Sequence, residues 1–259
     1  RRVHASVEIH PSPGLGLPTI ADQDKWFALL GLLLKRWASL ADATNPFTFS
    51  TPELLRALRL TTDSGKNYLD VQRWLDVMSA TTIVSHESVY FAGARRWVRD
   101  RCRVFDRVVS AGCELEDGRT ADRNYVWLSS WLLENLRHHH VIFLDLDQYL
   151  LLNRPIAKGL VPLLQPGLRA GRDRGWYARS YPATCEVLGM RHYTQRSKVL
   201  EKLEPALDEL RHAQFISGWS IEPTKNGGDL KIVVHLDSHA AAPAAVASAG
   251  PDPRASRPS

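Results

Sequence analysis

The sequence predicts an α+β protein built from two tandem winged helix–turn–helix domains. Two helix-rich segments follow one another along the chain, and each is followed by segments rich in Val, Ile, Tyr and Trp that are typical of paired strands. We expect the first domain at residues 19–137 and the second at residues 138–237. An irregular arm is expected at residues 1–18, and a disordered tail rich in Ala, Pro and Ser at residues 238–259. The pattern leaves open an ordinary small α+β domain.

The first domain is predicted to contain three helices and a ribbon of strands. Residues 22–36 begin with acids and end with Lys and Arg, as the helix dipole favours. Residues 50–53, Ser-Thr-Pro-Glu, form a capping box before the next apolar run. After the break TTDSG, residues 66–78 place apolar side chains, Tyr68 among them, at helical spacing. Three segments between residues 81 and 136 are expected to be strands.

The second domain is predicted to repeat this order. Helices are expected at residues 145–165, 182–190 and 193–213, and the last of them carries an apolar stripe. Residues 215–236 then alternate as two strands, joined at 226–228 by Asn-Gly-Gly, which tolerates the positive φ angles of a tight hairpin. This hairpin is the expected wing.

Composition restricts the class of protein. The chain has 259 residues, a net charge of +5 and a pI near 9.2, which favours acidic partners. Its three cysteines, Cys102, Cys113 and Cys185, lack CxxC spacing, which argues against a disulfide framework or a zinc knuckle and favours a reducing compartment. The longest apolar run is too short to span a bilayer, and no signal peptide is visible. We therefore expect a cytoplasmic protein with no membrane partner.

Two groups of residues raise the possibility of a metal site. The pair Asp145 and Asp147 could bind a cation in a metal-dependent enzyme, or could begin a helix as the acids at 22–24 do. A phosphatase of the haloacid type would have Thr or Val where this chain has Tyr149. Adjacent residues on a strand point to opposite faces, so the histidines at 138–140 are poorly suited to chelate one ion and read as a solvated linker. We expect a helix start, with no catalytic residues, metal or cofactor.

Basic residues are concentrated around the last predicted helix. Between Arg154 and Glu204 the chain has ten Lys and Arg against four Asp and Glu, a surplus larger than the net charge of the whole chain. A winged helix–turn–helix places this helix in the major groove and its wing beside the backbone. The alternative is a solvated helix end. The candidate DNA-binding residues of the second domain are Arg191, Tyr193, Thr194, Gln195, Arg196, Ser197, Lys198 and Lys202, with Lys225 and Lys231 on the wing.

The first domain offers fewer candidates. Its parallel DNA-binding residues are Ser64, Lys66, Asn67 and Arg73. A second basic cluster lies in the predicted ribbon and comprises Arg95, Arg96, Arg99, Arg101 and Arg103. This cluster could grip the DNA backbone or simply solubilise a sheet edge.

Four stretches resemble plasmid replication initiators of the replication initiator protein A type. They are GLPTIADQDKWFALLGLL, TTDSGKNYLDVQRWLDVMSATTI, NYVWLSSWLLENLRHHHVIFLDLDQYLLLNRPIAKGLVPLL and RHYTQRSKVLEKLEPALDELRHAQFI, in order across residues 14–236. The resemblance implies a winged-helix protein that binds repeated sites in double-stranded origin DNA and recruits host replication proteins, such as a helicase or its loader. A homodimer is possible, and no catalytic site is implied. Helix breakers from Pro162 onward depart from the pattern.

Three functions therefore stand as hypotheses. The first is an origin-binding replication initiator. The second is a transcriptional repressor on the same scaffold, because both functions need only specific binding to duplex DNA. The third is a metal-dependent enzyme, which would require Asp145 and Asp147 to converge in a pocket.

Overall fold

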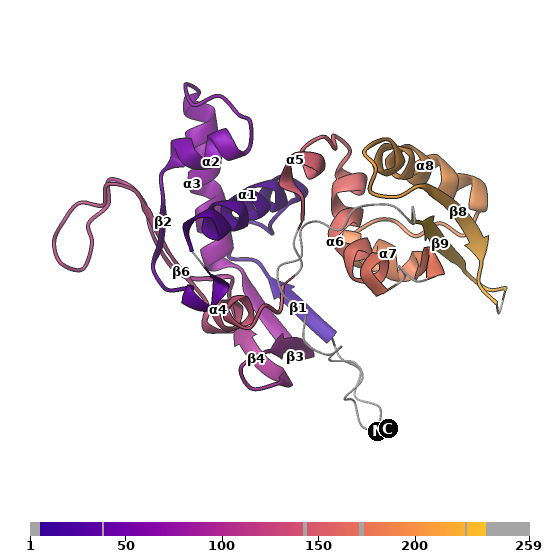
Figure 1. The fold of residues 1–259 in the computed structure, drawn as a ribbon, viewed down its shortest axis with the longest axis horizontal. Helices are drawn as coiled ribbons and strands as arrows, with labels where there is room; N and C mark the ends of the chain where they lie inside the picture. Colours follow the sequence, from indigo (N-terminus) through magenta and orange to yellow (C-terminus); the bar gives the residue numbers. More distant parts are fainter. Residues whose placement is uncertain (1–5, 38, 142–143, 171–173, 226, 237–259) are drawn as a thin grey trace. The chain divides into compact units, whose positions relative to one another are not determined.

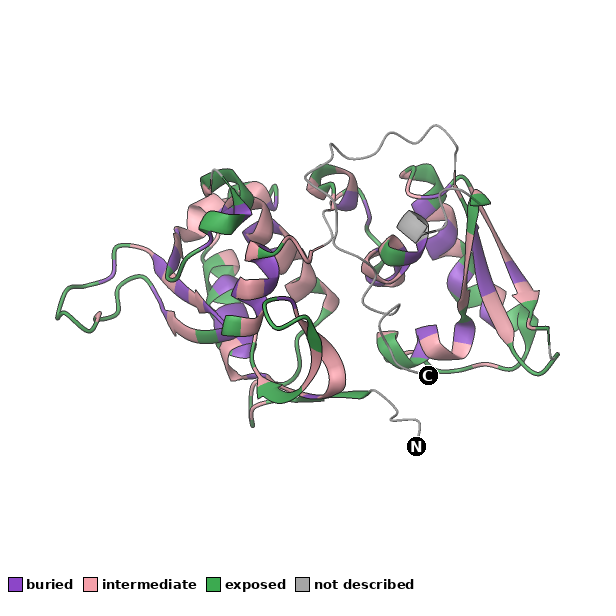
Figure 2. Ribbon diagram, turned by 60° about the horizontal axis from the view of Figure 1, so that its bottom comes forward, coloured by how far each residue is buried: buried purple, intermediate pink, exposed green. Residues whose placement is uncertain are grey.

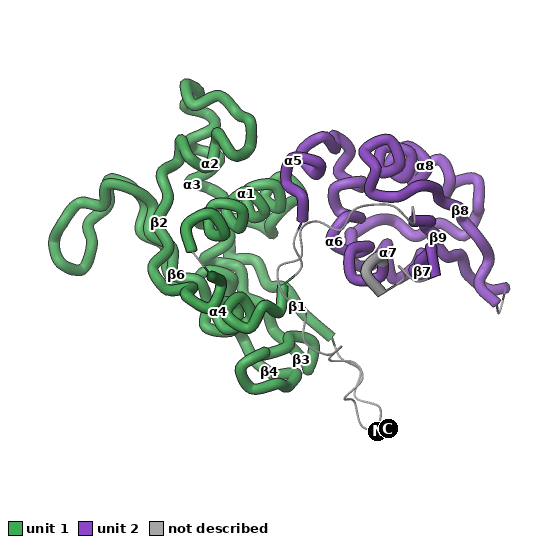
Figure 3. Tube along the Cα trace, in the orientation of Figure 1, with its two compact units in different colours: residues 1–141, 245–259 green, residues 142–244 purple. Residues whose placement is uncertain are grey.

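The computed structural model describes residues 6–37, 39–141, 144–170, 174–225 and 227–236. These residues form two compact units, unit 1 up to Val141 and unit 2 from Leu144 to Leu236 (Figure 1, Figure 3). Buried residues gather inside each unit (Figure 2). The tail expected at residues 238–259 lies outside the described residues.

Unit 1 packs helices against two antiparallel three-stranded sheets. Its elements are β1 (Ser6–His10), α1 (Ile20–Arg36), the short helix η1 (Leu40–Asp42), β2 (Phe47–Phe49), α2 (Thr51–Ala57), α3 (Gly65–Ala80), β3 (Thr82–Phe91), β4 (Arg96–Cys102), β5 (Phe105–Val109), β6 (Asn124–Leu128) and α4 (Ser130–Arg137). One sheet has the strand order β1-β3-β4 and the other β2-β6-β5.

Side-chain caps fix where the first helices begin. Thr19 caps α1, and its backbone N–H donates to a carboxylate oxygen of Asp22 at 2.7 Å. The sequence predicted that this helix begins at Asp22. It begins two residues earlier, at Ile20. The predicted capping box of α2 is confirmed, because the N–H of Ser50 donates to Glu53 at 2.6 Å and the N–H of Glu53 donates to the Ser50 hydroxyl at 3.3 Å.

The core of unit 1 includes contacts of α3 with α1 and β5. Trp74 of α3 and Phe105 of β5 are fully buried, and their ring centroids lie 5.7 Å apart, edge to face. Lys25 of α1 is buried, and its Nζ lies 2.8 Å from a carboxylate oxygen of Asp70 on α3 and 3.3 Å from one of Asp22. Because a buried ammonium needs a charged partner, this cluster ties α1 to α3.

Two segments of unit 1 differ from the sequence prediction. Residues 6–10, expected within an irregular arm, form β1 and pair with β3, although all five are exposed, Val7 and Ile9 included. Residues 130–137, expected within a strand, form α4. Leu132, Leu133 and Leu136 are buried at helical spacing, so their period decides the structure against the β propensity of the nearby aromatic residues.

The histidines after α4 are not a simple solvated linker. His138 is the C-cap of α4, and the ring centroid of His140 lies 4.6 Å from that of Tyr90 on β3. Burial lowers the pKa of His140. Among the described residues, no group of three or more His, Cys, Asp or Glu side chains is placed to hold a metal ion.

Unit 2 packs helices against one antiparallel sheet. Its elements are α5 (Leu146–Tyr149), α6 (Pro155–Ala170), β7 (Trp176–Ser180), α7 (Tyr181–Leu188), α8 (Arg196–His212), β8 (Gly218–Pro223) and β9 (Leu230–His235). The strand order is β7-β9-β8.

The helix predicted at residues 145–165 is two helices, α5 and α6. The helix is interrupted before Pro155, because proline disfavours the helical conformation in the residue that precedes it. Glu209 of α8 stabilises the start of α6. Its two carboxylate oxygens accept hydrogen bonds from the backbone N–H groups of Asn153 at 2.8 Å and Arg154 at 3.0 Å.

Asp145 begins a helix, as the sequence predicted. It is the N-cap of α5, and its Oδ1 accepts a hydrogen bond from the backbone N–H of Gln148 at 3.0 Å. One oxygen of the Asp145 carboxylate is thus engaged by the helix itself. The hypothesis of a metal-dependent enzyme loses the observation on which it rested.

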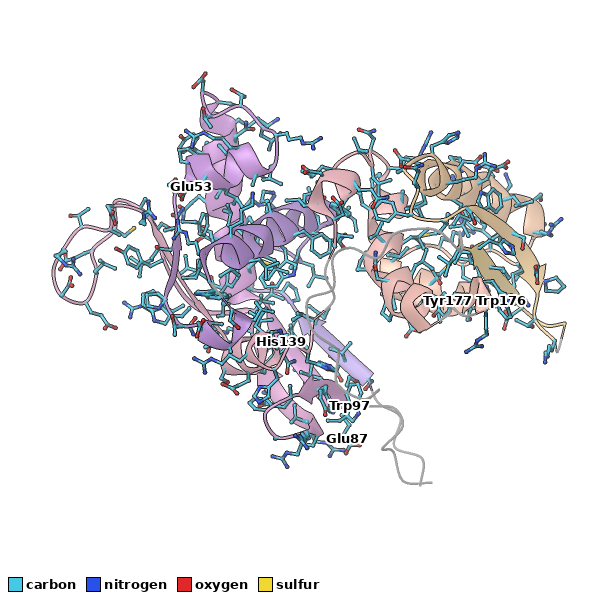
Figure 4. All side chains as sticks on the ribbon, in the orientation of Figure 1. Glu53, Glu87, Trp97, His139, Trp176 and Tyr177 are labelled. Carbon is cyan, nitrogen blue, oxygen red and sulfur yellow. The ribbon has the colours of Figure 1, made fainter. Side chains whose placement is uncertain are left out.

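Helix α6 continues through Pro162 and Pro166 to Ala170, although the sequence left its end open. It packs closely on β7 at Gly167. A Cβ atom at this position would lie 2.2 Å from the Cζ atom of Tyr177, whose side chain is labelled in Figure 4. Glycine is required here because the aromatic ring fills the space that any side chain would occupy.

The last helix and hairpin agree with the sequence prediction. Val199, Leu203, Leu207 and Leu210 form the predicted apolar stripe of α8 and are fully buried. β8 pairs antiparallel with β9. In the connecting turn Gly227 has a φ of +69°, while position 226 lies outside the described residues.

The two units share one order of elements. Unit 1 contains α1-β2-α2-α3-β5-β6 and unit 2 contains α6-β7-α7-α8-β8-β9. In both, the last strand lies between the other two in the sheet. In both, therefore, a helix pair is followed by an antiparallel strand pair.

Candidate nucleic-acid interface

The segment between α7 and α8 carries the predicted contacts at 191–195. Gly189 ends α7 with a φ of +60°, the left-handed conformation that glycine adopts without strain. Tyr181 is fully buried, and burial raises its pKa to about 12. Its hydroxyl accepts a hydrogen bond from the backbone N–H of Tyr193 at 3.3 Å. The core of unit 2 therefore holds this segment in place.

The side chains of this segment are not equally free. The guanidinium of Arg191 lies 5.3 Å from the ring centroid of half-buried Tyr193, a cation–π arrangement. Thr194 and Gln195 are exposed, and Gln195 is the N-cap of α8. The sequence predicted that the helix begins at Tyr193, but α8 begins at Arg196, so Tyr193 and Thr194 precede the helix.

The first two turns of α8 present paired charges to solvent. Ser197, Lys198 and Lys202 are exposed. The Nζ of Lys198 lies 2.8 Å from one carboxylate oxygen of Glu201, and the Nζ of Lys202 lies 3.7 Å from the other. The hydrogen bond to Glu201 raises the pKa of Lys198, and the same bond lowers the pKa of Glu201. A phosphate at this surface would have to compete with Glu201 for both ammonium groups.

Arg196 joins the start of α8 to the hairpin. Its Nη2 donates to the backbone carbonyl of Ile221 on β8 at 3.4 Å. One part of the exposed guanidinium is therefore already hydrogen-bonded within unit 2. On β9, the Nζ of Lys231 lies 3.0 Å from a carboxylate oxygen of Glu222. Lys225 is exposed beside the hairpin turn.

The hairpin and the segment before α8 enclose a small hollow of about 120 Å³. Tyr193 and Thr194 line it on one side, and Pro223 and Leu230 on the other. The structure thus places Tyr193 and Thr194 beside the hairpin, whereas the predicted wing residues Lys225 and Lys231 do not line the hollow.

Three of the four predicted residues of unit 1 lie at the start of α3 and Arg73 lies in its middle, and most of them are partly engaged. Ser64 is the N-cap, and Lys66 is exposed in the first turn. The Nδ2 of Asn67 donates to the backbone carbonyl of Thr61 at 2.9 Å, which fastens the preceding turn. Arg73 donates to the carbonyl of Leu15 at 3.5 Å. Of the four, Lys66 has the most accessible charge.

The sequence prediction did not identify two apolar residues of α3 that are exposed to solvent. Leu69 is 74 % exposed and Tyr68 is 39 % exposed, although Tyr68 was expected in the apolar stripe. Leu69 could have been found, because it lies off the stripe that Val71 and Leu75 define. An exposed leucine beside Lys66 suits contact with thymine methyl groups.

None of the helices in the described residues combines the length and apolar character that a membrane span requires. The family model of replication initiator protein A matches residues 1–180 of the chain. The chain belongs to the replication initiator protein A family. The resemblance seen in the sequence is confirmed, and it identifies a DNA-binding initiator of plasmid replication. No curated protein sequence matches this initiator.

Two solved structures share the fold of this initiator. Domains 2 and 3 of RctB are 17 % identical to it with a TM-score of 0.52, and the similarity covers 90 % of this chain and 87 % of that one. The Pi initiator protein, solved in complex with iteron DNA, is 12 % identical with a TM-score of 0.54, over 89 % of this chain and 97 % of that one.

Proposed function

We propose that both units are winged helix–turn–helix domains and that they bind repeated sites at a plasmid origin in tandem. The bounds expected from the sequence, residues 19–137 and 138–237, differ from the units, because β1 pairs within unit 1 and unit 1 extends to Val141. The shared order of elements supports this proposal, because α3 and α8 each follow a short helix and precede a strand pair. The solved complex of the Pi initiator protein with iteron DNA, a structure of similar fold, also supports it.

The start of α8 carries the proposal. Gln195 and Ser197 supply hydrogen-bonding groups for base edges, while Lys198, Lys202 and the wing residues Lys225 and Lys231 supply charge for phosphates. Arg191, Tyr193, Thr194 and Arg196 shape and hold this surface. In unit 1, Ser64, Lys66, Asn67 and Arg73 contact an adjoining part of the site, with Leu69 against bases.

Bound at the origin, the initiator would act through binding alone, in the cytoplasm, and would recruit host replication proteins such as a helicase or its loader. A homodimer is one form it could take off DNA. No step of this function requires catalysis or a cofactor.

Footprinting on DNA that flanks the gene tests the proposal. We expect several protected repeats at regular spacing, and a cloned fragment with these repeats should replicate only when the initiator is supplied. One protected site over a promoter, with no replication from the fragment, would instead indicate a repressor.

Glu201 should weaken DNA binding in the wild-type protein. We expect Glu201→Gln to bind origin DNA several-fold more tightly at low salt, because Lys198 and Lys202 would be released for phosphates. The matched control is Glu204→Gln, which neutralises an exposed acid one turn further along α8. Equal gains in both variants would show a general charge effect and no competition at Lys198.

A further inference from the structure

Unit 1 contains a hairpin that unit 2 lacks. In unit 2, residues 213–217 lead directly from α8 to β8. In unit 1, the strands β3 and β4 are inserted between α3 and β5. This hairpin is held firmly, because the buried side chain of Asn135 on α4 accepts from the N–H of Ala92 at 2.8 Å and donates to the carbonyl of Tyr90 at 2.8 Å.

β4 is an edge strand. Among the strands of the described residues, the sheet order β1-β3-β4 gives it a single neighbour, so one side of its backbone is open to pairing with a further strand. The N–H of Arg101 donates to the Oδ1 of Asp100 at 2.7 Å. An added strand that uses this amide would replace the carboxylate of Asp100 as its acceptor.

The hairpin also carries unbalanced positive charge. Its residues 82–102 contain four arginines and two acids, Glu87 and Asp100. Arg99 lies 3.9 Å from Glu87, whereas in the described part of the chain no ion pair engages Arg95, Arg96 or Arg101 (Figure 4 labels Glu87 and Trp97 here). All four arginines are exposed.

The hairpin begins at the C-terminal end of α3, beyond the residues proposed to contact DNA. α3 has 16 residues and is therefore about 24 Å long. In the proposed function, on which this step rests, α3 contacts DNA through residues between Ser64 and Arg73, and β3 begins just beyond its last turn (Figure 1). The arginines are thus available to a partner other than the DNA bound by α3.

We propose that β4 binds an extended acidic segment of a partner protein by strand addition. Backbone hydrogen bonds would hold the segment, and Arg99 and Arg101, which lie on one face at alternate positions, would pair with acids spaced two residues apart. A second copy of β4 is a poor occupant, because arginines would lie near arginines across the new ladder.

The probe for the test is a fluorescein-labelled ten-residue peptide of alternating Glu and Thr, added to the full chain at low salt and followed by anisotropy. We expect binding that the double variant R99E/R101E weakens by about tenfold or more. The control K35E/R119E, which reverses two exposed cations of unit 1 outside the hairpin, should bind as the wild type does. Absence of binding to the wild type, or equal loss in both variants, overturns the proposal.

A second peptide, N-methylated at alternate residues, separates strand addition from charge attraction. It should bind much more weakly, and equal binding overturns strand addition. If R99E/R101E does not fold by circular dichroism, R99Q/R101Q replaces it and should still weaken binding. Gel shifts complete the test. Loss of DNA affinity in the hairpin variant would make the arginines a DNA contact and overturn the proposal, whereas wild-type protein that binds no origin DNA would contradict the proposed function alone.

Discussion

The double variant K198E/K202E should lose affinity for origin DNA by about a hundredfold at physiological salt, because each lysine that contacts a phosphate releases counterions on binding. The slope of log affinity against log salt concentration should fall by about two, one for each contact removed. Gel shifts across a series of salt concentrations measure both quantities. Sequence preference should change little, because phosphate contacts do not read bases.

The hairpin variant R99E/R101E is the matched control for this prediction, because it changes the net charge of the chain by the same amount. It should keep most of the wild-type DNA affinity. If both variants lose affinity equally, the effect reflects total charge, and α8 has no special role at the DNA.

Gly167→Ala should destabilise the protein by about 2 kcal/mol, although alanine normally stabilises a helix relative to glycine. The added methyl carbon would meet the ring of Tyr177 at 2.2 Å, so α6 and β7 would have to separate or the ring would have to move. Urea unfolding of wild type and variant, followed by circular dichroism, gives the difference.

The partner substitution makes this prediction specific. In a Tyr177→Ala background the space above Gly167 is open, and Gly167→Ala should then be neutral or stabilising. A loss of stability of equal size in both backgrounds would show that the ring is not the cause.

The parts of the fold that the sequence predicts well are those with a regular local pattern. The stripe of Val199, Leu203 and Leu207 repeats at helical spacing, so it needs only its own residues to be recognised. The hairpin of unit 2 is recognised from its β-branched residues and its turn, because the consecutive residues 232–234 are all buried and burial does not alternate there. The capping box at Ser50 and Glu53 is equally local.

The sequence prediction is weaker where a distant contact decides the structure. The start of α8 depends on Tyr181, which holds the backbone of Tyr193. The roles of single candidates also depend on long-range contacts, since Arg196 donates to Ile221 and Arg73 to Leu15. Residue type and spacing suggest where a charge lies along the chain, but they do not show which groups already engage it.

The carboxylate of Glu209 couples the position of α8 to that of α6. It accepts hydrogen bonds from two consecutive backbone N–H groups just before Pro155. The C-terminal half of α8 is therefore linked to the start of α6. Any shift of α8 along its axis would therefore strain both hydrogen bonds and displace the start of α6.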